Sequence, residues 1–190
     1  MSGRASRAAK RDRTHAPKAY DAYFTVDPRP VPALLRHFKP RGSIWEPCAG
    51  RGDLGWALMT AGFTVSCTDL IDHGGAVVEH GYDFLKAETC SAETIITNPP
   101  NQRNVEITAH AIKLQERNAG AVAIYQRHEW DTNAERGREL FDHPAFAMKV
   151  ACRFRPVWFA DGGGENPFHR WSWYVWDWQS VGIDPIIKFS

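Results

Sequence analysis

The stretch from residue 43 to residue 69, SIWEPCAGRGDLGWALMTAGFTVSCTD, decides the fold class. Its first six residues predict a short buried strand that stops at the glycine-rich turn of residues 49–52. Asp53 is a candidate N-cap for a helix that Gly62 ends. Apolar residues at helical spacing support this helix: Leu54, Ala57, Leu58 and Ala61. A second predicted strand then leads to Asp69, and a strand, a turn, a helix and a strand form the repeating unit of parallel α/β sheets.

The rest of the chain continues this alternation. Further strands are predicted at residues 82–85, 94–97, 120–125, 145–150 and 171–178, and helices at residues 103–117 and 131–142. Strands that alternate with helices favour a Rossmann-like α/β fold, with a mostly parallel seven-stranded sheet and helices on both faces. The glycine-rich loop of residues 161–164 separates the last two strands, which we expect to pair antiparallel at one edge.

Length and charge indicate one domain preceded by a tail. The chain has 190 residues, of which 43% are apolar, and this is enough for one domain with a substantial core. Its net charge of +1 hides a split, because residues 1–19 hold six basic residues and one acid, Asp12, and residues 20–190 are net acidic. We expect residues 1–19 to be a flexible basic tail, either a solubilising arm or a contact for phosphates, and residues 20–190 to be the folded domain.

Several classes of protein are disfavoured. The N-terminal stretch lacks the apolar core of a secretion signal, and no apolar run is long enough to cross a membrane. The histidines show no metal-binding spacing, and no CxxC pair occurs among the cysteines, Cys48, Cys67, Cys90 and Cys152. We therefore expect no bound metal ion, no disulfide framework and a reducing cytoplasmic location.

The glycine turn predicts a ligand site, because ligands of such sheets bind beyond the carboxyl ends of the strands. Gly50, Gly52 and Gly55 have the spacing GxGxxG between a strand and a helix, which suits a dinucleotide or S-adenosylmethionine. Glu46 favours S-adenosylmethionine, since a carboxylate attracts its cationic amino group and repels a pyrophosphate. Asp69 is expected either to bind ribose hydroxyls or to cap a turn.

Residues 98–101, Asn-Pro-Pro-Asn, follow the predicted strand of residues 94–97. Two successive prolines fix the backbone there and prevent a helix from starting. The Asn98 side chain and the Pro99 carbonyl could then accept both hydrogens of a conjugated amine. This would turn the nitrogen lone pair away from the ring and toward a methyl donor.

Together these motifs resemble the class I S-adenosylmethionine-dependent methyltransferases, specifically the amino-methyltransferases with an Asn-Pro-Pro-Tyr motif. Within them the sequence is most similar to small DNA adenine methyltransferases of phages and prophages, which implies DNA as partner and a bacterial or phage-infected cell. The resemblance implies catalysis by Asn98, Pro99, Pro100 and Asn101. It implies a cofactor site formed by Tyr23, Phe24, Thr25, Glu46, Pro47, Cys48, Ala49, Gly50, Gly52, Asp69, Leu70, Asp83, Phe84 and Asn98. Among these, Asp83 and Phe84 are expected to surround the cofactor adenine.

Asn101 departs from the pattern, because this position normally holds an aromatic ring that stacks on the flipped target base. One interpretation is that Asn101 caps the helix of residues 103–117. Otherwise another ring substitutes, the substrate is not a flipped adenine, or activity is reduced. Trp130 is the first candidate for the substitute ring.

The candidate substrate-binding residues are Arg103, Arg127, Trp130, His169 and Arg170. The aromatic strand of residues 171–178 follows them, and its alternation is typical of a strand buried on both faces rather than of a base-stacking surface. Trp171, Trp173 and Val175 are expected on one face. Tyr174, Trp176 and Trp178 are expected on the other.

The favoured function is methyl transfer to an exocyclic amine, most of all adenine in DNA. RNA adenine or a protein glutamine amide would suit the same motif. Because Asn101 replaces the usual aromatic residue, a non-catalytic module that binds S-adenosylmethionine is an alternative. The interpretation as an NAD-dependent dehydrogenase is supported by the glycine spacing alone, and it does not explain residues 98–101.

Overall fold

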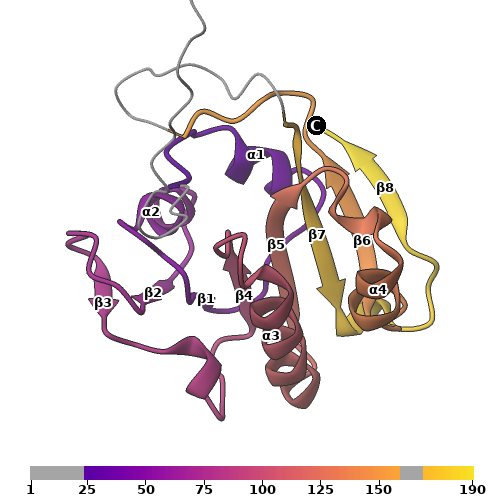
Figure 1. Ribbon diagram of the computed structural model, residues 1–190, viewed down its shortest axis with the longest axis horizontal. Helices are drawn as coiled ribbons and strands as arrows, with labels where there is room; N and C mark the ends of the chain where they lie inside the picture. Colours follow the sequence, from indigo (N-terminus) through magenta and orange to yellow (C-terminus); the bar gives the residue numbers. More distant parts are fainter. Residues whose placement is uncertain (1–23, 159–168) are drawn as a thin grey trace, which may run out of the picture.

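The computed structural model describes residues 24–158 and 169–190 as one mixed eight-stranded sheet between two layers of helices (Figure 1). The strands are β1 (Ile44–Glu46), β2 (Val65–Asp69), β3 (Val78–His80), β4 (Thr94–Thr97), β5 (Ala121–Arg127), β6 (Phe146–Ala151), β7 (Trp171–Asp177) and β8 (Ile186–Phe189). The α-helices are α1 (Pro30–Leu35), α2 (Asp53–Thr60), α3 (Asn104–Asn118) and α4 (Ala134–Arg136). The predicted α/β class and the mostly parallel sheet are confirmed.

The strand order is β3-β2-β1-β4-β5-β7-β6-β8. Strands β1 to β5 pair in parallel, β7 runs antiparallel between β5 and β6, and β8 runs parallel to β6. The antiparallel pairing of the last two predicted strands is therefore confirmed, although it is not at the edge of the sheet. The predicted count of seven strands is wrong, because β8 lies outside β6.

Two other predicted elements differ from the structure. The strand expected at residues 82–85 is a loop with a 3₁₀ turn, Phe84–Lys86, because the Asp83 carboxylate accepts a hydrogen bond from Leu85 N–H and starts the turn. The third strand lies earlier, at β3. The helix expected at residues 131–142 is broken into short turns around α4, which the Asn133 side chain caps.

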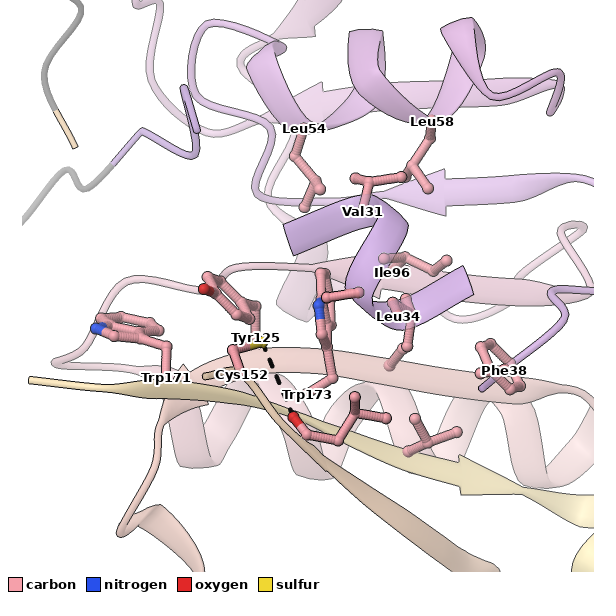
Figure 2. Close-up of a cluster of buried hydrophobic side chains, with 14 of the residues drawn as sticks. Val31, Leu34, Phe38, Leu54, Leu58, Ile96, Tyr125, Cys152, Trp171 and Trp173 are labelled. Atoms are coloured by element: carbon pink, nitrogen blue, oxygen red, sulfur yellow. Dashed lines mark hydrogen bonds between the residues drawn. The ribbon is translucent and has the colours of Figure 1, made fainter. Parts of the chain in front are cut away.

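The two sheet faces form two separate cores. On one face, α1 and α2 pack Val31, Leu34, Leu54 and Leu58 against the sheet (Figure 2). On the other, α3 packs against alternate residues of the same strands. The predicted alternation of β7 is confirmed, since Trp171, Trp173 and Val175 join the first core and Tyr174, Trp176 and Trp178 the second. Both faces of β7 are buried, so these rings pack in the two cores.

No helix in the described ranges is long and apolar enough to span a membrane. The predicted basic tail, residues 1–19, and the glycine-rich loop of residues 161–164 lie outside the described residues, as does Tyr23.

Candidate active site

A cavity of about 350 Å³ lies where β1, β2 and β4 end. Most of the predicted site residues line it: Phe24, Pro47, Cys48, Gly50, Asp69, Leu70, Asp83, Phe84, Asn98, Pro99, Pro100, Asn101 and Arg103. Motifs far apart in the sequence meet here because parallel strands present their carboxyl ends at one edge of the sheet. Other predicted residues lie outside this lining: Thr25, Glu46, Ala49, Gly52, Arg127, Trp130, His169 and Arg170.

The glycine turn shapes one wall of the cavity. Gly50 has a φ of +58°, and a Cβ built there would lie 2.7 Å from the Phe24 ring. Only glycine therefore allows Phe24 to cover the turn. Gly52, with φ +85°, occupies the N-cap position of α2, so the prediction of Asp53 as N-cap is wrong by one residue.

Gly55 lets α2 lie directly on the sheet. A Cβ there would collide with Cys67 Sγ and approach Glu46 Oε2. The close approach brings the first turn of α2, with its free backbone N–H groups, to the end of β1. All three glycines of the predicted motif thus have a structural reason.

Glu46 is 1% exposed and lies directly behind the turn. Gly55 N–H donates a hydrogen bond to its carboxylate, whereas Oε2 has no partner among the described residues. Burial raises the pKa of Glu46 well above its usual range, and the nearby carboxylates of Asp69 and Asp53 raise it further. A buried carboxylate oxygen without a donor is costly unless a cation or another donor reaches it.

Asp69 ends β2 and ties the turn to the next loop. Its Oδ2 accepts a hydrogen bond of 2.7 Å from Gly50 N–H, and its Oδ1 one of 2.9 Å from Ile71 N–H. The turn-capping interpretation is therefore correct. The carboxylate also lines the cavity, and each of its oxygens has a second lone pair for a ligand hydroxyl.

The loop of residues 98–101 also lines the cavity, and other side chains hold both of its predicted acceptors in place. Asn98 Nδ2 donates a 3.0 Å hydrogen bond to Thr25 Oγ1, which orients the amide. The buried Gln126 donates from Nε2 to the Pro99 carbonyl at 3.1 Å. Sequence reasoning missed Gln126, although its place near the end of β5 puts it beside this loop.

Asn101 does not cap α3. The N-cap position belongs to Arg103, which makes no capping hydrogen bond and instead pairs with Glu106 at 3.0 Å. The interpretation of Asn101 as a helix cap is wrong, and Asn101 remains a polar residue of the cavity wall.

Apolar and aromatic side chains form a further part of the cavity lining. Leu70 is 51% exposed there, and Phe84 packs edge-on against Trp45 and His110. The cavity lining also contains residues that were not predicted as site residues from the sequence: Ile71, His73, Tyr82, Leu85, Gln102, Ile107 and Trp171. A flat apolar ring system would fit between these groups.

Trp130 is not the substitute ring. It is 4% exposed and packs edge-on against Phe141 and Tyr174 in the core under α3, away from the cavity. The ring that does reach the cavity is Trp171, at the start of β7. Its indole Nε1 is buried and has no hydrogen-bond partner among the described residues.

The remaining predicted substrate residues cluster at the end of β5. Arg127 pairs with Trp171 in the sheet, and His128 N–H donates to the Arg170 carbonyl at 2.9 Å. His169 Nδ1 lies 3.8 Å from the carboxylate of Glu129, so the two pair when the imidazole is protonated. Arg127 and Arg170 therefore lie beside Trp171, although neither residue lines the cavity.

The strand order, with β7 inserted antiparallel beside β5, and a ligand cavity at the ends of β1, β2 and β4 define a known architecture. The fold is that of the class I methyltransferases. A protein from Listeria monocytogenes described as a class I S-adenosylmethionine-dependent methyltransferase matches with a TM-score of 0.60 at 13% identity, over 89% of this chain and 66% of that one. A type I restriction-modification methyltransferase subunit from Streptococcus thermophilus matches with a TM-score of 0.52 at 12% identity, over 83% of this chain and 46% of that one.

A protein from Pyrococcus horikoshii described as an RNA methyltransferase also matches, with a TM-score of 0.54 at 12% identity, over 77% of this chain and 79% of that one. The chain spans less than two thirds of the length of the first two proteins. No model of a protein family matches the sequence, and no curated protein matches it. At such low identity the likeness concerns the fold.

Within residues 24–158 and 169–190, no group of three or more His, Cys, Asp or Glu side chains is arranged to hold a metal ion.

Proposed function

We propose that the protein transfers a methyl group from S-adenosylmethionine to an exocyclic amine, with adenine in DNA as the favoured substrate. The observation that carries the proposal is that Asn98 and Pro99, the two predicted acceptors, line the same cavity as the glycine turn. A catalytic methyltransferase needs both a cofactor cradle and an amine-orienting loop. A non-catalytic module would need only the first.

The residues present fit S-adenosylmethionine. Glu46 Oε2 is a buried carboxyl oxygen without a hydrogen-bond partner among the described residues, and we assign to it the cationic amino group of the cofactor as donor. Asp69 would accept bonds from the ribose hydroxyls, Leu70 and Phe84 would hold the adenine, and the Asp83 carboxylate would accept from its amine. When bound, the cofactor supplies an electrophilic methyl group on a sulfonium.

In the proposed reaction, the residues of this chain orient the substrate amine. Asn98 Nδ2 donates to Thr25 Oγ1, which orients the amide, and we assign to the amide oxygen the role of side-chain acceptor for a substrate amine. Gln126 fixes the Pro99 carbonyl, the second acceptor. Two acceptors in fixed places rotate the amine so that its lone pair points at the donor, and such positioning accounts for much of the rate enhancement in reactions of this kind.

Trp171 and the neighbouring arginines support a nucleic-acid substrate. We assign to Trp171, whose side chain contributes to the cavity lining, the base contact that Asn101 cannot make. Arg103 lines the cavity, and Arg127 and Arg170 lie beside Trp171 at the end of β5, so these residues are the candidates for phosphate contacts. A base must leave a duplex to enter such a cavity, at a cost of a few kcal/mol.

Substitution of Asn98 tests the proposal. We expect Asn98→Ala to bind S-adenosylmethionine like the wild type in calorimetry and to lose methyl transfer by about 100-fold or more, because one of the two acceptors is gone. The matched control is Asn133→Ala, which removes an exposed asparagine that caps α4. Unchanged turnover of Asn98→Ala would contradict the proposed role of the loop.

Labelled cofactor offered with DNA, RNA and glutamine-containing protein identifies the substrate class. We expect label in adenine of DNA. Label in RNA or in protein would redirect the assignment and keep the mechanism, whereas cofactor binding without transfer to any of the three would favour the non-catalytic module.

A further inference from the structure

The sheet edge that holds the cavity continues over the ends of β5, β7 and β6 (Figure 1). Because β7 runs antiparallel to both of its neighbours, its first residue lies at the same edge as the last residues of β5 and β6. Trp171 is this first residue of β7, and it lines the cavity. Cys152 N–H donates to the Trp171 carbonyl and continues the pairing of β6 with β7 by one residue. The chain segments next to Trp171 therefore border the candidate active site.

The next pair in this register is Arg153 and Arg170. Arg153 N–H donates to the Ser190 carbonyl, on the side of β8. The Arg170 carbonyl accepts from His128 N–H, on the side of β5. The backbone groups of the two arginines thus turn away from each other, as in the non-hydrogen-bonded pairs of antiparallel strands, whose Cα atoms are only about 4.5 Å apart. The two side chains therefore start from neighbouring backbone positions.

Both arginine side chains point to the same face of the sheet. Cys152 and Trp171 belong to the core under α1 and α2. Successive side chains of an extended chain point to opposite faces, so Arg153 and Arg170 point toward the face that α3 covers. Both arginines are exposed. The register thus places two solvent-accessible guanidinium groups side by side at this edge.

The positive charge of this pair is not neutralised by the protein. Neither guanidinium has an ion-pair partner within residues 24–158 and 169–190. Two acids lie close by along the chain, but Asp131 pairs with Lys149 at 2.8 Å, and Glu129 lies 3.8 Å from His169. Like charges directly opposite each other destabilise a sheet. The pair is therefore unfavourable unless it binds an anion.

Phe189 supports the Arg153 side chain without neutralising it. The guanidinium lies over the Phe189 ring, 5.1 Å from the ring centroid. A guanidinium over an aromatic ring keeps its charge, and the N–H groups at the edge of its plane can still donate to an anion.

We propose that Arg153 and Arg170 bind the phosphodiester backbone of the nucleic-acid substrate, which reaches the cavity across the ends of β6 and β7. Arginine suits this contact because its forked donors bind phosphate oxygens in pairs. A phosphate also relieves the repulsion between the two guanidinium groups. Since Trp171 follows Arg170 directly, the phosphate contacts lie next to the residue assigned to the target base. This inference rests on the proposed nucleic-acid substrate, to which it adds Arg153 and a direction of approach.

Binding of duplex DNA to the full chain tests the two arginines. We expect Arg153→Gln and Arg170→Gln each to weaken binding at low salt. Each should lower the slope of log affinity against log salt concentration by about 0.9, the value for one lost phosphate contact on duplex DNA, and the double variant should lose about twice as much. The affinity for S-adenosylmethionine should stay unchanged in calorimetry, because neither arginine lines the cavity.

Two control variants separate this pair from general effects of charge. Arg153→Lys keeps the positive charge and should keep most of the slope. Lys113→Gln removes an equal charge from an exposed position on α3, toward the opposite edge of the sheet, and should leave the slope near that of the wild type. Unchanged slopes in both glutamine variants, an equal loss in Lys113→Gln, or a loss in Arg153→Lys as large as in Arg153→Gln overturns the proposal.

Inorganic phosphate distinguishes a nucleic-acid backbone from a free anion. We expect phosphate to raise the melting temperature of the wild type no more than a chloride salt of equal ionic strength does. If phosphate stabilises the wild type but not the double variant, and the two bind DNA equally well, the pair binds a free anion and the proposal is overturned.

Labelled cofactor separates this inference from the proposed function. A wild type that methylates DNA, together with a double variant of unchanged DNA affinity, refutes the arginine contacts and leaves methyl transfer to DNA in place. A wild type that neither binds nor methylates nucleic acid refutes both. A double variant that methylates DNA with a raised KM and a largely retained kcat supports both.

Discussion

Single side chains decide whether the cavity can act on an amine. In the proposed reaction Asn98 and Pro99 supply the acceptors, and Thr25 and Gln126, from other parts of the chain, hold these two residues by hydrogen bonds. The motif of residues 98–101 is visible in the sequence because its residues are contiguous. The supports are not visible, because nothing in a sequence says which threonine or glutamine will lie beside it.

Glu46 gives a prediction about pH at the same scale. Its pKa is raised in the folded chain by burial, so the unliganded protein gains stability from this group below its ordinary pKa of 4.5 and loses it as the pH rises through the raised value. Glu46→Gln should remove this loss. In thermal melts between pH 4 and pH 8, the stability of the variant relative to the wild type should increase as the pH rises. At neutral pH its free energy of unfolding should exceed that of the wild type by about 1–3 kcal/mol.

The same variant should bind S-adenosylmethionine more weakly, because the cofactor amino group loses its carboxylate partner. Asp53→Asn is the control, since it removes a partly exposed carboxylate close by. A Glu46→Gln protein with unchanged cofactor affinity would contradict the assigned role of Glu46.

At the scale of elements, the fit of α2 on the sheet depends on one missing methyl group. Gly55→Ala should destabilise the fold by about 1–3 kcal/mol, because the new Cβ would collide with Cys67 Sγ and approach Glu46. Gly137→Ala is the matched control, since nothing lies within 4 Å of a Cβ built there and it should be neutral or slightly stabilising. Urea denaturation monitored by circular dichroism measures both, and equal stabilities would contradict the packing argument.

The sequence predicts elements well where a pattern has one physical explanation. Residues 43–69 alternate in a way that only a strand, a turn, a helix and a strand satisfy, and the structure has β1, α2 and β2 there. β8 was missed because Ile186–Phe189 has no alternation, and its four residues are all exposed. The prediction that Trp130 lies at the ligand site was wrong because a position after a strand does not determine the direction of the side chain. The Trp130 ring packs against Phe141 in the core instead.

For the whole molecule, charge is uneven along the chain. Residues 1–19 hold an excess of basic groups, and the net acidic remainder would repel phosphates except near local arginines. Deletion of residues 1–18 should therefore weaken DNA binding at low salt and reduce its salt dependence. Binding titrations at several salt concentrations measure both quantities. An unaltered affinity and slope would show that the tail takes no part.

The reactivity of the four cysteine thiols can be used to measure local unfolding of the protein. Burial raises the pKa of Cys67 to about 12 and that of Cys152 to about 12, and it also raises the pKa values of Cys48 and Cys90. Alkylating reagents attack the thiolate, so the closed protein should react very slowly at neutral pH. The rate of alkylation then reports how often the region around each thiol opens. Cys48 lines the cavity, so bound cofactor should slow its alkylation. Cys152 is buried in the core beneath β6, so it should be alkylated only when the sheet itself unfolds.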